Sequence, residues 1–348
     1  MSGVVHTVLG PVDPDRLGHV QPHEHLLADL GRYAPDDAVD EPVVPANYFA
    51  SRVNRNNRRD LVLDEVDTAV DELALYREAG GGTVVDATPV GLGRDPAGLR
   101  EISRRSGVQV VMGSGYYVAA FHPPEVAALP RDAVTRQITG DIQQGADDTG
   151  IRAGIIGEIG MSWPPHPDEV KVLQAAAQAQ TETGAALLIH PGRHAEAPLL
   201  HLRQAVEAGA DPARTVLCHV DRTLFEPDET LALADTGCVL EFDLFGTESS
   251  YYPPDPTVDL PNDGMRVRHI AALVAAGHGD RITIAEDVCR RTQLVRYGGE
   301  GYAHILRRVL PLMAARGISP EDVTRITRTT PARLLTLPVT PDLPGRTV

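Results

Sequence analysis

Short runs rich in valine and isoleucine alternate with helix-forming stretches along most of this chain, and this alternation constrains the fold. The runs lack clean polar–apolar alternation, so they are typical of strands buried on both faces. Strands that alternate with helices form a parallel sheet, and eight such units in 348 residues predict a closed (β/α)8 TIM barrel. We expect the strands near residues 20–27, 83–87, 108–112, 154–159, 185–190, 215–219, 238–243 and 281–287.

The segments between and around these strands complete a single-domain interpretation of residues 1–348. Residues 1–17 are expected to form a short N-terminal β-hairpin, and residues 318–348 a C-terminal helix and tail. An open, doubly wound sheet is the alternative, but no Gly-x-Gly-x-x-Gly follows the first strand, which disfavours a nucleotide-binding version. Helices are expected at residues 61–79, 96–106, 131–144, 168–184, 197–208, 227–236, 265–277, 304–316 and 319–337.

Composition excludes several classes of partner. The formal net charge of −16 disfavours nucleic acid and anionic membranes, because both require a basic face. No apolar run approaches the ~20 residues that span a bilayer, and the N-terminus lacks the pattern of a signal peptide. The three cysteines form no Cys-x-x-Cys pair. We therefore expect a cytoplasmic protein that acts on a small molecule.

Metal-binding side chains stand at the ends of the expected strands. In a barrel of this kind the active site lies at the carboxyl ends of the strands, so these residues are expected to converge. Six donors exceed the three that a hydrolytic zinc ion takes from protein, but they suit two divalent ions that share a carboxylate. Each residue alone has an ordinary structural explanation, whereas the whole set predicts a metal centre. The set is His23, His25, Glu158, His190, His219 and Asp287.

Longer motifs around these residues resemble one protein family. The sequence is similar to the phosphotriesterase-like branch of the amidohydrolase superfamily, and most similar to its phosphotriesterase-related proteins. The motifs include Thr7–Pro11 with Leu17–Gly18, Gly154–Gly160 with Ser162–Pro164, His190–Arg193, His219–Thr223, Asp243–Glu248 and Tyr297–Gly299.

The resemblance implies a division of the ligands between two ions. His23, His25 and Asp287 would hold one ion, and His190 and His219 the other. Founding members bridge the ions with a carboxylated lysine, but position 158 is glutamate, and Lys171, the only lysine, lies in the following helix. Glu158 would therefore bridge the two ions directly. This departure from the founding members disfavours efficient organophosphate hydrolysis.

The chemistry expected of such a pair is hydrolysis. Two divalent ions lower the pKa of a shared water, so that a hydroxide attacks the substrate carbonyl while Asp287 passes a proton to the leaving group. Zinc is the first expectation, and Mn²⁺, Co²⁺ or Fe²⁺ would also suit these ligands. Relatives of this fold commonly dimerise, so a homodimer is an expectation as well.

The predicted substrate is a small anionic N-acyl compound. The resemblance implies an N-acetyltaurine-like amide; alternatives are a lactone, carboxylic ester or phosphotriester, or a non-catalytic ligand-binding protein on the same scaffold. Arginine side chains beyond the strand ends would grip an anionic group, with structural pairing to Glu241, Asp243 or Asp221 as the alternative. The arginines at 52, 55, 58 and 59 are instead expected to be solvent-exposed. The predicted substrate contacts are Arg193, Arg222, Trp163, Tyr117 and Tyr252.

Overall fold

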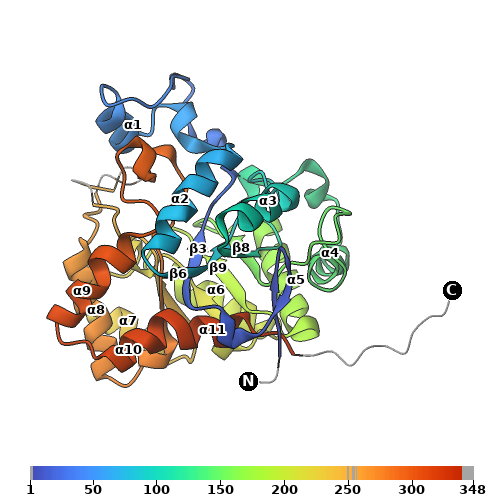
Figure 1. The fold of residues 1–348 in the computed structure, drawn as a ribbon. Helices are drawn as coiled ribbons and strands as arrows, with labels where there is room; N and C mark the ends of the chain where they lie inside the picture. Colours follow the sequence, from blue (N-terminus) through green and yellow to red (C-terminus); the bar gives the residue numbers. More distant parts are fainter. Residues whose placement is uncertain (1–2, 249–250, 253–254, 256, 339–348) are drawn as a thin grey trace.

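Eight parallel strands form the centre of the computed structural model, which describes residues 3–248, 251–252, 255 and 257–338 (Figure 1). Hydrogen bonding divides them into a three-stranded sheet, β3-β6-β7, and a five-stranded sheet, β8-β9-β10-β11-β12, in which every neighbouring pair is parallel. The strands are β3 His19–Glu24, β6 Gly81–Asp86, β7 Gln109–Met112, β8 Ile156–Gly160, β9 Leu187–His190, β10 Thr215–Leu217, β11 Val239–Phe242 and β12 Ile282–Ile284.

Backbone hydrogen bonds join the two sheets into a closed barrel. On one side, Gly154 N donates to Met112 O over 2.9 Å, and Gly157 N donates to Ser114 O over 2.6 Å. On the other side, His25 N donates to Val288 O over 3.1 Å. The predicted TIM barrel is therefore confirmed, with strand positions that agree with the sequence pattern.

A layer of apolar side chains fills the inside of the barrel at its lower end. Val20, Val85, Val111, Leu188 and Val216 come from five different strands and pack into one buried cluster. Leu334 and Leu335, in the last described helix, α11 (Thr330–Leu335), join the same cluster and close that end. The six predicted metal-binding side chains lie at the opposite, carboxyl end of the strands, where they were expected.

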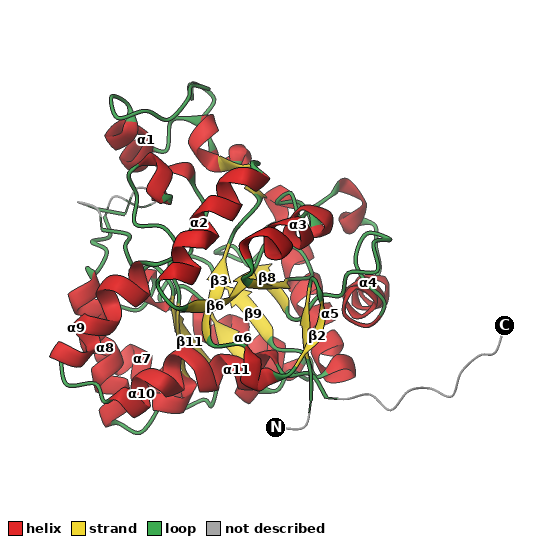
Figure 2. Cartoon of the chain, viewed as in Figure 1, coloured by secondary structure: helices red, strands yellow, loops and turns green. Residues whose placement is uncertain are grey.

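Helices surround the strands (Figure 2). Two predicted helices, α3 and α5, begin and end within about two residues of the expected positions because they have clear caps. Asp95 and His166 accept backbone N–H groups at the starts of α3 and α5, and Gly184 ends α5 in the left-handed conformation. The helices are α2 Val66–Glu78, α3 Pro96–Ser106, α4 Arg131–Gln143, α5 Pro167–Thr183, α6 Ala197–Glu207, α7 Pro227–Ala234 and α8 Asp263–Ala275, followed by α9 Leu310–Ala315, α10 Pro320–Thr324 and α11 Thr330–Leu335.

The last two predicted helices differ from simple α-helices. Ile305–Val309 and Arg325–Thr329 are π-helical turns, which precede α9 and link α10 to α11. At the other end of the chain, the expected N-terminal hairpin is present as β1 Val5–Thr7 paired with β2 Gly10–Val12. Val4 and Leu337 exchange two backbone hydrogen bonds, so the first and last described segments lie together.

The polar segment from residue 29 to residue 60 contains structure of its own. A short helix, α1 Tyr48–Asn54, lies within it, and β4 Ala28–Asp29 pairs antiparallel with β5 Val62–Leu63 at the base. In Figure 1, α1 stands at the top of the molecule, on the loop side of the barrel. Among the described residues, no helix has both the length and the apolar character needed to cross a membrane.

Candidate metal centre

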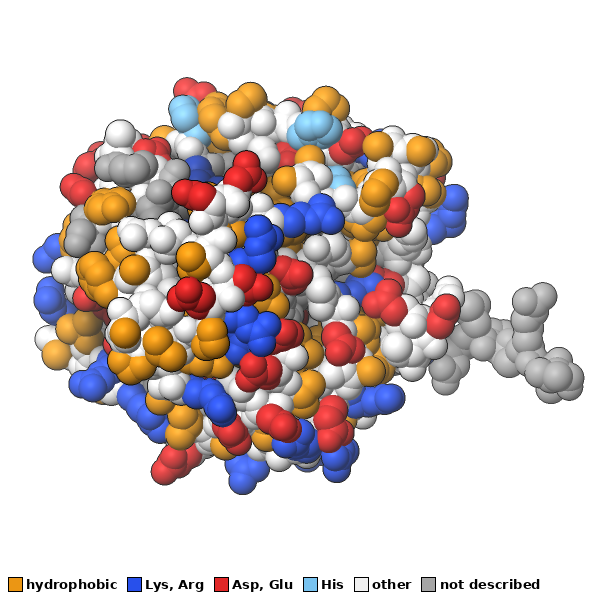
Figure 3. All heavy atoms as spheres, turned by 90° about the horizontal axis from the view of Figure 1, so that it is seen from above, with side chains coloured by type: hydrophobic (Ala, Val, Ile, Leu, Met, Phe, Trp, Pro, Cys, Tyr) orange, Lys and Arg blue, Asp and Glu red, His pale blue; other side chains and the backbone are white. Residues whose placement is uncertain are grey.

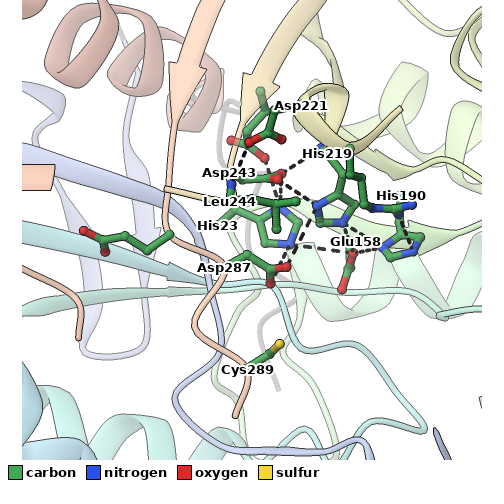
Figure 4. Close-up of polar contacts among 12 residues, drawn as sticks. His23, Glu158, His190, His219, Asp221, Asp243, Leu244, Asp287 and Cys289 are labelled. Carbon is green, nitrogen blue, oxygen red and sulfur yellow. Dashed lines mark hydrogen bonds and ion pairs between the residues drawn. The ribbon is translucent and has the colours of Figure 1, made fainter. Parts of the chain in front are cut away.

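The six predicted donors converge at the carboxyl end of the barrel. His23 and Glu158 lie within β3 and β8, and His190 is the last residue of β9. His25, His219 and Asp287 lie one to three residues beyond β3, β10 and β12. Figure 4 shows five of these side chains, all but His25, pointing toward one another.

Glu158 occupies the middle of this group. Its Oε2 lies 2.7 Å from His190 Nδ1, 3.4 Å from His219 Nε2 and 3.6 Å from His23 Nε2. Its Oε1 lies 3.5 Å from His25 Nε2. One buried carboxylate therefore faces all four imidazoles, as a bridging ligand would.

Asp287 lies on the His25 side of the group and faces the pocket. Its Oδ1 is 3.4 Å from His25 Nε2 and 4.0 Å from His23 Nε2. Its side chain is 16% exposed, against 3% for Glu158. Asp287 is thus the carboxylate of this group that a bound substrate can reach.

Hydrogen bonds on the far side of three imidazoles fix their orientation. His23 Nδ1 lies 2.9 Å from Glu241 Oε2, His219 Nδ1 lies 2.8 Å from Asp243 Oδ1, and His25 Nδ1 lies 2.8 Å from Thr88 Oγ1. In each case the Nε2 atom is left facing Glu158. Imidazoles that ligate metals are typically held in this way through the other ring nitrogen.

His190 has the opposite orientation. Its Nδ1 faces Glu158, while its Nε2 lies 3.0 Å from Arg222 Nη2 and 3.3 Å from the Tyr117 hydroxyl oxygen. Gly160 allows the backbone at Tyr117 to pack closely against β8, because a Cβ at position 160 would overlap the Tyr117 backbone. His190 would therefore bind an ion through Nδ1 and the other three histidines through Nε2.

Protonation differs among the four imidazoles of the group. Burial acts to raise the pKa of Glu158, but the neighbouring imidazoles, His190 foremost, hold it well below its usual value. Burial lowers the pKa of His190 to about 4 and that of His219 well below its usual value, so both are neutral, as metal ligands must be. Burial acts to lower the pKa values of His23 and His25 as well, but nearby acidic groups raise both, so a metal ion would have to displace a proton there.

The unpaired donor atoms of the group also suit a bound cation. His23 Nε2 is buried without a hydrogen-bond partner among the described residues. The donor atoms of His23, His25 and Asp287 lie within 4.8 Å of one another, and those of His23, Glu158 and His219 do so as well. A deeper set combines His23 with Cys218, Glu241 and Asp243, but those two carboxylates already bind imidazoles.

Two of the six residues have strained backbones. His219 and Asp287 have φ angles of 55° and 48°, in the left-handed region that residues other than glycine seldom adopt. Such a conformation costs on the order of 1–3 kcal/mol and persists where surrounding structure enforces it, most often at functional sites. The strain is consistent with selection for the positions of these two side chains.

A pocket of about 850 Å³, its open mouth included, lies above the group. Four of the five predicted substrate contacts line it: Tyr117, Arg193, Arg222 and Tyr252. Arg193 Nε donates to the Tyr252 hydroxyl over 2.7 Å, and Arg222 Nη2 donates to Pro191 O over 3.1 Å.

The position of Trp163 does not match its predicted role in this pocket. Its indole stacks on His194, with ring centroids 4.3 Å apart and planes 7° from parallel. It borders a separate, apolar depression formed with α6 and α7. Trp163 therefore packs on His194 outside the barrel mouth, and this packing accounts for an aromatic side chain at the position.

The carboxylates considered as structural partners of Arg193 and Arg222 bind other groups. Glu241 and Asp243 accept hydrogen bonds from His23 and His219. Asp221 pairs with the fully buried Arg266, whose Nε lies 2.7 Å from Asp221 Oδ2.

Sequence reasoning missed three arginines of the pocket. Arg52 and Arg55 were expected in solvent, but they line the pocket together with Arg290, while Arg58 and Arg59 are exposed as expected. Arg290 could have been found from the sequence, because it lies only three residues after the predicted ligand Asp287. The polar segment that contains Arg52 and Arg55 gives no such indication.

Comparisons with known proteins show which proteins this chain is similar to. The chain is 42% identical to the N-acetyltaurine hydrolase of Salmo salar, over 97% of this chain and 99% of that protein. A resiniferatoxin-binding protein from Rhodobacter sphaeroides superposes with a TM-score of 0.92 at 36% identity, covering 96% of this chain and 95% of that one. The phosphotriesterase homology protein of Escherichia coli, complexed with phosphate in its active site, gives 0.77 at 29%, covering 93% and 100%.

A family model also matches most of the chain. The model of the phosphotriesterase family matches residues 3–335, which include all six converging donors. The chain therefore belongs to the phosphotriesterase family and is a metal-dependent hydrolase.

Proposed function

We propose that this protein hydrolyses the amide bond of a small anionic N-acyl compound, with an N-acetylated amino sulfonate such as N-acetyltaurine as the first candidate. The observation that carries the proposal is the position of Glu158, whose carboxylate faces four imidazole nitrogens within 3.6 Å. The identity of 42% to an N-acetyltaurine hydrolase supports the choice of substrate.

The family resemblance supports a division of the ligands between two ions. His23, His25 and Asp287 would hold one divalent ion and His190 and His219 the other, with Glu158 shared between them. When bound, such a pair lowers the pKa of water toward neutrality and acts as a Lewis acid on a carbonyl group. Zinc is the first candidate for both positions, because His and carboxylate ligands suit it.

Asp287 is the proposed proton carrier. Burial acts to raise its pKa, but hydrogen bonding to His25 and the charges of nearby histidines lower it, so the carboxylate is ionised at neutral pH and can accept a proton. It lines the pocket, where it can pass that proton to the leaving nitrogen. This transfer matters for an amide, because an amine leaves only after protonation.

The pocket's arginines favour an anionic substrate. Arg193 and Arg222 lie on the wall next to His190 and carry charges that a sulfonate or carboxylate would neutralise. Tyr117 and Tyr252 are proposed as further walls of the pocket.

A substrate comparison tests the proposal. Purified, metal-loaded protein is assayed with N-acetyltaurine, a panel of lactones and carboxylic esters, and paraoxon. We expect the highest kcat/KM with N-acetyltaurine. Efficient lactone turnover without amide turnover would favour the lactonase alternative, and specific ligand binding with no turnover of any substrate would favour a binding protein.

Several further expectations stay predictions. A single domain is checked by one cooperative unfolding transition, and a homodimer by light scattering. Cytoplasmic location is checked by fractionation of the source cells. Metal analysis distinguishes zinc from manganese, cobalt and iron.

A further inference from the structure

We infer that Arg55 and Arg290, together with the free Nη1 of Arg222, form a subsite that binds the acidic group of the substrate and favours a sulfonate over a carboxylate. This inference rests on the proposed function, because it names the part of the pocket that selects among N-acyl compounds. It assigns this role to two residues for which the sequence pattern predicted none.

Buried arginine nitrogens without partners are the first observation. Arg222 and Arg290 are each only 5% exposed. Arg222 Nη1, Arg290 Nε and Arg55 Nε are buried, and none has a hydrogen-bond partner among the described residues. Leaving a charged donor unpaired in the interior is costly, so a ligand with acceptor atoms would stabilise these groups.

The contacts of Arg290 leave one of its donors unused. Its Nη1 donates to the backbone oxygen of Arg52 over 3.1 Å and forms an ion pair with Asp60, whose Oδ2 is 3.7 Å away. Asp60 also accepts hydrogen bonds from the backbone nitrogen and hydroxyl of Thr292. The Nε of Arg290 has no hydrogen-bond partner among the described residues, so this donor is left for a ligand.

The backbone of Arg55 points to a function of its side chain. Arg55 ends α1 in the left-handed conformation, with φ 52°, where glycine or asparagine is usual. Burial, and then the charge of nearby Arg290, lowers its pKa to about 10, so it is still charged at neutral pH. Two cations close together in a buried site indicate a place for an anion.

The charge of the pocket lining is local. Five arginines line the pocket, against the carboxylates of Glu248 and Asp287. On the face seen in Figure 3, Lys and Arg side chains are interspersed with Asp and Glu, and no broad patch of one sign is visible. A small anion, and not an extended polyanion, therefore fits this cluster.

The origin of the three arginines in separate segments favours a group with three acceptor oxygens. Arg55 comes from the end of α1, Arg222 follows β10 and Arg290 follows β12, so the three approach from different segments of the barrel mouth. A planar carboxylate is satisfied by the two parallel donors of a single arginine. The three oxygens of a sulfonate diverge and can accept from all three side chains.

The test compares three amides that differ in the acidic group. N-acetyltaurine carries a sulfonate, N-acetyl-β-alanine a carboxylate, and N-ethylacetamide neither. The enzymes are wild type, Arg55→Gln, Arg290→Gln and, as control, Arg59→Gln on the exposed surface of the same segment. Gln keeps a long polar side chain, and at position 55 it faces the same backbone strain as arginine. Thermal unfolding of each variant monitors folding.

We expect wild type to prefer N-acetyltaurine to both other amides. Arg55→Gln and Arg290→Gln should each lower the ratio of kcat/KM for N-acetyltaurine over N-ethylacetamide about 10- to 100-fold, chiefly through KM. Arg59→Gln should leave the ratio unchanged. An unchanged ratio in both subsite variants overturns the inference, and equal turnover of the sulfonate and carboxylate by wild type overturns the preference for sulfonate.

A binding measurement separates this inference from the proposed function. Ethanesulfonate and propionate are titrated into metal-free wild type and the two variants, and the thermal shift is recorded. A shift with ethanesulfonate in wild type that is lost in the variants supports the subsite even if no amide is hydrolysed. No shift in wild type, or equal shifts in all three proteins, overturns it. If one variant does not fold, the other decides.

Discussion

Replacing Glu241 with glutamine isolates the contribution of the charge behind one proposed metal ligand. Glu241 is buried in β11, its Oε2 lies 2.9 Å from His23 Nδ1, and its Oε1 accepts a hydrogen bond from the Thr283 hydroxyl over 3.0 Å. A glutamine at this position has the same shape. Its amide oxygen can still accept from His23, and its amide nitrogen can donate to Thr283, since a hydroxyl also accepts. The variant therefore loses the negative charge and little else.

The magnitude follows from the role of that charge. The carboxylate fixes the orientation of His23 and makes its Nε2 a better donor to a cation. Losing such a partner typically lowers metal affinity 10- to 100-fold, which corresponds to about 1.4–2.7 kcal/mol. His23 is assigned to the ion that His25 and Asp287 would also hold. The affinity for that ion should therefore fall more than the affinity for the other ion.

The assay is a titration of metal-free protein with zinc in the presence of a competing chelator. Wild type, Glu241→Gln and the control Glu169→Gln are compared. Glu169 is a buried carboxylate that accepts from Ala119, Ser162 and His166 and contacts no proposed ligand, so its loss should affect folding stability and not zinc affinity. Equal zinc affinities for Glu241→Gln and wild type would refute the assigned orientation of His23.

Three further predictions concern turnover and folding. Asp287→Asn should lower kcat by about 10²–10⁴-fold while the protein keeps much of its metal; turnover equal to wild type would remove Asp287 as proton carrier. Arg266→Met leaves the buried Asp221 without its ion-pair partner, while Asp263 keeps its contact with His304, so the free energy of unfolding should fall by about 3–5 kcal/mol. At roughly 2.1 cal/mol/K per residue, that lowers Tm by about 4–7 °C in calorimetry, and an unchanged Tm contradicts it. Burial acts to lower the pKa of His304, but its hydrogen bond to Asp263 raises it. The stability that His304→Gln removes from metal-free protein should thus be largest below about pH 6.5 and shrink as pH rises, and unfolding curves with no such trend would contradict it.

The barrel and the positions of the six donors followed from local patterns. Strands buried on both faces leave continuous apolar runs, and a polar side chain at the end of such a run stands out. His23 and His25 are two residues apart in an extended segment, so both face the site while Glu24 turns away and accepts the backbone N–H groups of Glu286 and Val288.

Arg52 and Arg55 had no comparable signal. Arg55 lies in a polar segment whose composition is typical of solvent-exposed loops, and its burial depends on α1 and on the pairing of β4 with β5, which joins residues more than 30 positions apart. The contact between Trp163 and His194 likewise depends on two loops that follow different strands. Long-range contacts of this kind leave no period in the sequence.

The most direct test of the binuclear centre is a metal analysis of the purified protein combined with its activity on N-acetyltaurine. We expect about two divalent ions per chain, loss of activity when a chelator removes them, and recovery when zinc is returned. In Glu158→Ala, both ions should bind weakly, because the shared carboxylate is gone. Full activity in a sample free of bound metal, or an unchanged pair of ions in Glu158→Ala, would contradict the assignment of Glu158 as the bridge.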